Sequence, residues 1–548
     1  MKKTRILSIL SATSLVAMLV VAIPTTANAA GPLCNGGLAV NSCQGATSDS
    51  APYVMQVPGN FNGTLVLYSH GYRPNLNVPA GIPGYGGYVV NNTPQPGPLV
   101  GAGKDTSVIA YLLSNGFAVA GSGFARQGWN TDSGVATDVE LIGVFKKQFP
   151  TTKHVVAWGE SLGGFITQAL AETHPELVDA VAPLCMASGT IENELTMAGD
   201  FLWGTKTLFD PSIKGGNYSA GAAGYGEAMG DMVKFFTVIG KLKAGISTGA
   251  WPDTSSATGK ALAAAGIPVR SALLMLGLMS GIPTQSAHFD SISGPEGALK
   301  LAFPLAVSPA LAILENGANA GALAILVTHD VENQSGGAIF DNTKTDYAVR
   351  VADESVVFNV ALSGDDAIAG ILGALSVANP GAPRAKGDAT AIAKMRALLS
   401  HTGKINVPTI TMVGVADPVT PAGASQWLAD QYAAQYAAEK AKAYAAYKVE
   451  HIYVPVQKKL LSIWGTTPAT YTKFDGSTPI TTTAAAPGTN HCNFTTAQYL
   501  VVAKELTAAG STGKFLPGGL LNNLIRKAKN LSIDPFFRAP LLKFYQGE

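Results

Sequence analysis

Two stretches of this 548-residue chain alternate short apolar runs with helical segments, and this alternation constrains the fold more than any other feature. The second stretch begins near residue 404 and opens with the apolar run 405–415. The first covers 63–187 and contains four apolar runs that indicate buried strands, at 63–72, 117–120, 154–158 and 178–185. Strands that alternate with helices form a mostly parallel sheet covered on both faces. The sequence therefore predicts an α/β fold with a central sheet flanked by helices.

The alternation stops between about 191 and 399. This segment is rich in Gly, Ala, Leu and Met and has helical patches such as SALLMLGLM at 271–279, without a strand rhythm. We therefore expect a large, mainly helical cap inserted into the sheet domain. The apolar stretch 297–327 contains Lys300, Glu315 and two prolines, which favours buried or lid helices over a membrane span.

Residues 1–29 have the pattern of a secretory signal peptide. Three basic residues among the first five precede an apolar run at 6–23, and Ala-Asn-Ala at 27–29 matches a cleavage site. We expect a secreted or periplasmic protein with no stable membrane insertion after cleavage, and an uncleaved anchor helix is the alternative. The predicted organisation is then a signal peptide (1–29), a first half of the core (30–190), the cap (191–399) and a second half of the core (400–548).

The charge of the chain argues against a nucleic-acid partner. Charged residues make up 13% of the sequence, against roughly 25% in an average globular protein. The predicted mature chain is close to neutral, and no basic stripe is visible. Binding to nucleic acid needs such a stripe, so we expect no nucleic-acid partner.

Two glycine-rich stretches resemble nucleotide-binding motifs but lack required residues. GAGKDT at 101–106 has Pro98 in place of the first glycine of a phosphate loop and Asp105 in place of its Ser or Thr. GSGFARQG at 121–128 has Arg126 in place of the third glycine of a dinucleotide-binding loop. Because no His, Cys, Asp or Glu cluster has metal-ligand spacing either, we expect no cofactor and no metal.

The four cysteines indicate two disulfides, because an even number in an exported chain is typical of disulfide pairing. Three pairings of Cys34, Cys43, Cys185 and Cys492 are possible. Closeness in sequence favours Cys34–Cys43, which leaves Cys185–Cys492. Free buried thiols are the alternative.

Ser161 is the candidate nucleophile, since GESLG at 159–163 matches the G-x-S-x-G pattern. With 61 glycines in the chain, about half a match is expected by chance, and a second match surrounds Ser247. Ser161 lies where an apolar strand meets a helix, and its flanking glycines leave room for the sharp turn of a nucleophile elbow. Ser247 is instead followed by a Trp-Pro pair, which cannot open a long helix. A structural turn serine is the alternative role of Ser161.

A serine hydroxyl is a weak nucleophile and needs a base, for which His491 is the candidate. The stretch 480–494 indicates a last strand that runs into a loop carrying His491, directly before the closing helix. An ordinary surface loop histidine is the alternative. The other histidines fit the role of base less well because they start or end other elements, fall in or near the cap, or serve another loop: His70, His154, His174, His288, His329, His401 and His451.

Asp417 is the candidate that orients the imidazole of His491. It lies in the loop after the strand at 405–415, which resumes the sheet. A plain Asp-Pro turn is the alternative. Asp365 and Asp366 are the leading rivals for the same role.

The chain order Ser161, Asp417, His491 resembles that of the α/β-hydrolase superfamily. The resemblance covers about 63–187 and 404–509, and that superfamily commonly places its cap where this chain has its insertion. The resemblance implies that the backbone N–H groups of Tyr72, in the segment SHGY, and of Leu162 form an oxyanion hole. By the same likeness His70 shapes this loop rather than acting as the base.

A partial likeness to tannase and feruloyl esterase-type enzymes lies in HCNF, where Cys492 directly follows the candidate base. Those enzymes pair such a cysteine with one directly before the nucleophile, where this chain has Glu160. By analogy, a bond from Cys492 to Cys185 would hold the His491 loop in a similar way. The likeness implies a secreted bacterial carboxylesterase with a large cap.

The leading functional hypothesis is a secreted serine hydrolase that cleaves carboxylic esters through an acyl-enzyme. A large, weakly charged cap favours apolar or aromatic esters, either small or polymeric. A peptidase or amidase on the same fold is the alternative. A non-catalytic binding protein is a third, which the intact Ser, Asp and His set disfavours.

Overall fold

The computed structural model describes residues 31–37, 39–246, 250–252, 256–291, 302, 309–347, 383–447, 456–467 and 485–541. Several predictions fall outside these residues. They are the signal peptide, Ser247, the rival pair Asp365 and Asp366, and His451 with the possible strand that follows it.

A mixed sheet of ten described strands forms the core, in the order β1-β2-β3-β5-β4-β6-β7-β8-β9-β10. The strands from β5 to β9 in this order pair in parallel, and antiparallel pairs add β3, β2 and β1 at one edge and β10 at the other. The strands are β1 (Leu33–Cys34), β2 (Val40–Ala46), β3 (Pro52–Pro58), β4 (Thr64–Ser69), β5 (Ala118–Ser122), β6 (His154–Glu160), β7 (Ala180–Leu184), β8 (Thr409–Gly414), β9 (Leu460–Gly465) and β10 (Leu531–Ser532).

Helices cover both faces of this sheet, as the apolar runs require. In β4, Leu65 and Leu67 pack on one face against α2 (Thr131–Gln148) and α3 (Leu162–Thr173), while Val66 and Tyr68 pack on the other. Three helices cover that second face: α1 (Ser107–Ser114), α13 (Thr496–Thr512) and α14 (Gly518–Ala528). On the α3 side, α12 (Ala422–Tyr447) packs near β8 and β9. The predicted mostly parallel sheet flanked by helices is thus confirmed.

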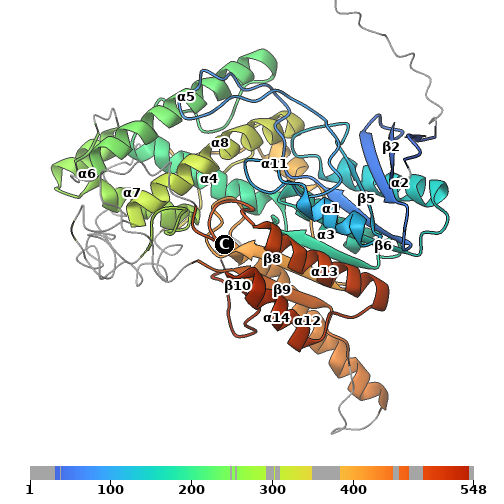
Figure 1. Ribbon diagram of the computed structural model, residues 1–548. Helices are drawn as coiled ribbons and strands as arrows, with labels where there is room; N and C mark the ends of the chain where they lie inside the picture. Colours follow the sequence, from blue (N-terminus) through green and yellow to red (C-terminus); the bar gives the residue numbers. More distant parts are fainter. Residues whose placement is uncertain are drawn as a thin grey trace, which may run out of the picture.

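The described elements between β7 and β8 are all helices, joined by loops (Figure 1). Its helices pack around a separate apolar core, to which α4, α5, α7 and α8 contribute most of the side chains. α8 is long and apolar enough to cross a membrane, but 67% of its most apolar window is buried inside the protein. It is therefore the central helix of this insertion. The helices are α4 (Ile191–Leu208), α5 (Gly221–Gly245), α6 (Ala257–Ala264), α7 (Val269–Ser280), α8 (Pro309–Ser335) and α11 (Ala389–Arg396).

The end of the sheet differs from the sequence prediction. The last strand was expected in 480–494, but the described part of this stretch, 485–494, forms turns and contributes only the isolated bridge between Thr489 and Ala416. Pro487 has no N–H for a strand ladder, and Gly488 has φ +72°, so the chain turns here. The last strand described before the closing helix is β9, whose run LLSIWG was not among the predicted strands. His491 therefore follows a turn and not a strand.

Candidate active site

Ser161 occupies a strained turn between β6 and α3. Its φ of 56° and ψ of −122° lie in a region that L-residues rarely adopt. A Cβ at Gly163 would approach the Ser69 carbonyl oxygen to 2.0 Å, and one at Gly159 would approach the Gly163 carbonyl oxygen to 2.3 Å. Only glycine fits at these two positions. The two glycines of the motif therefore allow the close strand–helix packing on which a nucleophile elbow depends.

The loop that follows β4 crosses directly over this turn. A Cβ at Gly71 would lie 3.3 Å from the Cβ of Ser161, and Tyr72 lines the same cavity as Ser161 and Leu162. His70 is buried beside Phe124, and burial lowers its pKa to about 4. As a neutral ring, it can donate from Nδ1 to the Gly71 carbonyl oxygen at 2.7 Å. This contact fits the predicted role of His70 in shaping the loop.

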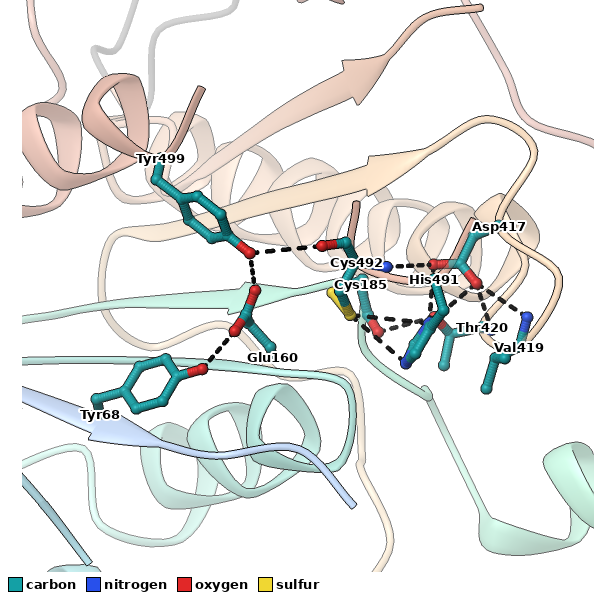
Figure 2. Close-up of a disulfide and its surroundings, with 9 residues drawn as sticks. All are labelled: Tyr68, Glu160, Cys185, Asp417, Val419, Thr420, His491, Cys492 and Tyr499. Carbon is teal, nitrogen blue, oxygen red and sulfur yellow. Dashed lines mark hydrogen bonds and ion pairs between the residues drawn. A yellow bond between two sulfur atoms is a disulfide. The ribbon is translucent and has the colours of Figure 1, made fainter. Parts of the chain in front are cut away.

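Asp417 and His491 are in direct contact. Nδ1 of His491 lies 2.9 Å and 3.0 Å from the two carboxylate oxygens of Asp417 (Figure 2). The Asp417 side chain is fully buried, and its Oδ1 accepts the backbone N–H groups of Val419 at 2.9 Å and Thr420 at 3.0 Å. Hydrogen bonds from the backbone hold the carboxylate in place, so that it fixes the orientation of the imidazole.

The environment of His491 raises its pKa above the usual value for histidine. Burial alone would lower this pKa, but the charge of Asp417 and its hydrogen bond outweigh burial, with further contributions from the charges of Glu160 and Glu194. A base with a raised pKa accepts a proton from a hydroxyl more readily.

A disulfide anchors the loop that carries His491. Cys492 is bonded to Cys185, the residue that follows β7, across a sequence separation of 307. The hydroxyl of Thr420 also donates to the Cys185 carbonyl oxygen at 2.8 Å, and so ties the Asp417 loop to the same point. The other disulfide joins Cys34 to Cys43. The pairing favoured by sequence closeness is the one present, and two disulfides are compatible with a secreted protein.

The three predicted catalytic residues all lie at the carboxyl edge of the parallel strands. Ser161 follows β6, and Asp417 lies beyond the end of β8. β7 lies between these two strands, and the disulfide from Cys185 at its end to Cys492 holds the neighbouring His491 there. Tyr499 links the residue before Ser161 to the His491 loop, because its hydroxyl donates to Glu160 and lies 3.5 Å from the carbonyl oxygen of Cys492. The structure thus brings together segments that are more than 300 residues apart in sequence.

A narrow, mostly apolar cavity of about 90 Å³ opens at Ser161. Its floor comes from the sheet domain, and its roof comes from α4 and α8 of the insertion. The lining residues on the core side are Tyr72, Trp129, Ser161, Leu162, Ala187, Pro418, Val419 and Thr420. Those on the insertion side are Glu194, Leu195, Met197, Ala198, Phe201, Ile282, Ala320, Leu323, Ala324 and Val327.

Sequence reasoning missed two acidic side chains in this region. Glu160 was noted only as a departure from a cysteine pattern, and Glu194 was not singled out. The position of Glu160 between an apolar strand and the candidate nucleophile could have indicated a carboxylate with a specific partner, because charged groups are rarely buried without one. Glu194 on α4 carried no comparable signal in the sequence.

Asp417, His491 and Cys492 offer ligand atoms within 4.8 Å of one another, the spacing of a metal site. The sulfur of Cys492 is bonded to Cys185, so it is not a thiolate. The nitrogen of His491 that faces Asp417 is occupied by that hydrogen bond. The donor chemistry of this cluster therefore fits a hydrogen-bonded Asp–His pair better than a zinc site.

The sheet, the strained turn after β6 and the helical insertion together define an α/β-hydrolase fold. No protein-family model matches this chain, and no curated protein matches its sequence.

Several solved esterase structures resemble the chain weakly. Feruloyl esterase B from Aspergillus oryzae is 15% identical with a TM-score of 0.33, over 72% of this chain and 70% of that one. An esterase from Aspergillus oryzae is 12% identical with a TM-score of 0.30, over 78% and 72%. The Pyrococcus furiosus esterase Pf2001 is 13% identical with a TM-score of 0.20, over 31% and 58%. Likenesses of this size carry no inference about activity, and the site has to be argued from its own geometry.

Proposed function

We propose that this protein is a secreted serine hydrolase that cleaves carboxylic esters through an acyl-enzyme intermediate. The observation that carries the proposal is the contact of His491 with the buried Asp417, at the same edge of the sheet as the strained turn of Ser161. Strain at a serine and a base oriented by a buried carboxylate are features of catalytic sites.

In the proposed reaction, the Ser161 hydroxyl attacks the ester carbonyl while His491 takes its proton and Asp417 stabilises the imidazolium. The oxyanion accepts hydrogen bonds from the backbone N–H groups of Tyr72 and Leu162, at the start of α3. The imidazolium then protonates the leaving alcohol. Water, activated by the same base, attacks the acyl-enzyme and releases the acid.

The cavity supports an apolar or aromatic group on the substrate. Most of its lining is apolar, with Trp129 and Phe201 among the aromatic side chains. Its roof belongs to the insertion, which we propose acts as a cap that selects substrates. An apolar wall favours an acyl or alcohol group of matching size by excluding water from it.

Hydrolysis of p-nitrophenyl esters of increasing acyl length, compared with aminoacyl p-nitroanilides, tests the proposal. Wild-type protein is expected to turn over the esters, and Ser161→Ala is expected to lose this activity while keeping its melting temperature. Preference for the anilides would instead support a peptidase or amidase. Ester turnover that survives Ser161→Ala would refute the proposal.

A further inference from the structure

Glu160, the residue before Ser161, is enclosed by two tyrosines from distant parts of the chain (Figure 2). The hydroxyl of Tyr68, on β4, donates to Oε2 of Glu160, and the hydroxyl of Tyr499, on α13, donates to Oε1. Tyr499 belongs to the helix that follows the His491 loop, and its hydroxyl also lies 3.5 Å from the Cys492 carbonyl oxygen. Through Tyr499, the carboxyl group of Glu160 is therefore linked to the loop that carries Cys492 and the candidate base.

Two hydroxyl donors on two carboxyl oxygens suit the ionised form of Glu160. An ionised carboxylate only accepts hydrogen bonds, whereas a protonated one must donate one. Burial works against ionisation and raises the pKa of Glu160 to about 7, although the Tyr68 hydrogen bond and the charge of His491 lower it. The pKa of Tyr68 is raised well above its usual value by burial and by Glu160, so Tyr68 stays protonated as a donor.

The Tyr499 hydroxyl joins Glu160 to the carbonyl of Cys492, the residue after His491, and the charges agree with this geometry in pointing to His491 as the partner of Glu160. His491 acts electrostatically on Glu160, and Glu160 in turn raises the pKa of His491. The other groups that face the pair are Tyr499, Asp417 and Glu194, with Arg73 acting on Tyr68. The imidazolium formed during acyl transfer is thus a cation generated near a partly buried anion, and a site partly removed from water strengthens this attraction.

We propose that Glu160 is a second positioning carboxylate, which together with Asp417 stabilises the imidazolium of His491, and that Tyr68 and Tyr499 hold it ionised. This inference rests on the proposed function, because it needs His491 to be the base. No atom of Glu160 takes part in bond making. Its contribution is electrostatic and depends on its charge.

The melting temperature of Glu160→Gln separates a charge-dependent role of Glu160 from a merely structural one. Because burial raises the pKa of Glu160 in the folded protein, ionisation lowers the stability of the fold as the pH rises through about 7. Removing the charge with Glu160→Gln is therefore expected to leave the melting temperature unchanged, or to raise it, above this pH. A structural anchor would lose stability instead.

The test compares kcat/KM of wild type and Glu160→Gln on one p-nitrophenyl ester across the pH range. The ratio of wild type to variant is expected to be near one at low pH, where Glu160 is protonated. It is expected to rise to about tenfold or more above neutral pH, the equivalent of about one pKa unit of interaction. The loss is expected in kcat rather than in KM, since the imidazolium forms only during the reaction.

Two conservative variants sharpen the test and do not depend on Glu160→Gln folding. Tyr68→Phe and Tyr499→Phe keep the edge-to-face packing of both rings on Trp158 and remove only the hydroxyl donors. Each is expected to raise the pH at which the activity reaches its plateau, because a carboxylate with fewer donors keeps its proton longer. Unchanged profiles in both would overturn the proposal.

Fluorophosphonate labelling of the wild type separates this inference from the proposed function. If Ser161 of the wild type does not react, the proposed function itself fails. If Ser161 reacts and Glu160→Gln keeps wild-type kcat at every pH, only the role of Glu160 fails. A variant that loses kcat in parallel with its melting temperature would also count against the charge-dependent role.

Discussion

The sheet domain and the helical insertion both bury carboxylates, but they give them different partners. In the sheet domain, Asp417 contacts an imidazole and Glu160 acts electrostatically on the same ring. In the insertion, Asp330 and Glu332 of α8 accept hydrogen bonds from backbone N–H groups of other segments. The first pair can respond to a proton moving on His491, whereas the second pair holds the chain in place. The partner of a buried carboxylate, and not its burial, indicates whether it serves chemistry.

Asp330 shows how the insertion is fastened above the candidate site. Its Oδ2 accepts the backbone N–H of Trp129 at 2.5 Å, and its Oδ1 accepts the side-chain amide of Asn75 at 2.6 Å. Trp129 and Tyr72, three residues before Asn75, both line the cavity at Ser161. Asp330 therefore ties α8 of the roof to two loops of the floor.

The largest expected effect is on the chemical step, from Asp417→Asn. An amide in place of the carboxylate favours the wrong tautomer of His491, so kcat is expected to fall by about 10⁴-fold. The matched control is Asp330→Asn, the same change in the insertion, for which kcat is expected to stay within about tenfold of the wild type. Steady-state kinetics on one ester substrate checks both. Equal losses in the two variants would remove the distinction between the two regions.

Breaking the Cys185–Cys492 disulfide with alanines is expected to lower both activity and stability. This bond joins two cysteines with a sequence separation of 307 and anchors the loop that carries the candidate base. Such a bond typically contributes about 2–4 kcal/mol to the free energy of unfolding. Removing Cys34–Cys43, with a separation of 9, is the control. That pair should cost less stability and leave kcat unchanged, as thermal melts and kinetics on the two double variants would establish.

Asp330→Asn is expected to act on stability and on substrate binding. An amide accepts hydrogen bonds less strongly than a carboxylate, and weakening bonds to buried N–H donors costs about 1–3 kcal/mol. The cavity roof should loosen, so KM is expected to rise. Urea unfolding and KM measured on the same preparation test this prediction. A rise in KM without loss of stability would mean that Asp330 acts on substrate rather than through the fold.

The smallest expected effect is on selectivity, from Ala324→Leu. Ala324 lines the cavity on α8, and a larger side chain there leaves less room for a long or aromatic acyl group. The ratio of kcat/KM for a long ester to that for an acetate ester is expected to fall by about tenfold. Asn319→Leu, at an exposed position of the same helix, is the control and should leave this ratio unchanged. A ratio unaffected by Ala324→Leu would place the acyl group elsewhere.

The sequence carried enough local information to predict the fold class and the candidate Ser161, Asp417 and His491. The glycines around Ser161 mark a turn by sterics alone, and buried parallel strands are continuous apolar runs. His491 was chosen because a strand was expected to lead into its loop. That part of the prediction was wrong, since the residues described directly before His491 form a turn.

Other features arise from contacts between distant segments, which local patterns do not report. Tyr68, Glu160 and Tyr499 come from β4, β6 and α13, and no sequence spacing links the two hydroxyls to the carboxylate. Asp330 and Trp129 are likewise 201 residues apart. β9 was missed because a short apolar run between less regular segments gives a weak strand signal.

The most direct test of the central claim is fluorophosphonate labelling of the folded protein, with the modified peptide mapped by mass spectrometry. A serine reacts quickly only when a base activates it. The account predicts a single label on the peptide that contains Ser161, and loss of this label in His491→Ala. Label on another serine, or no label on folded protein, would contradict it.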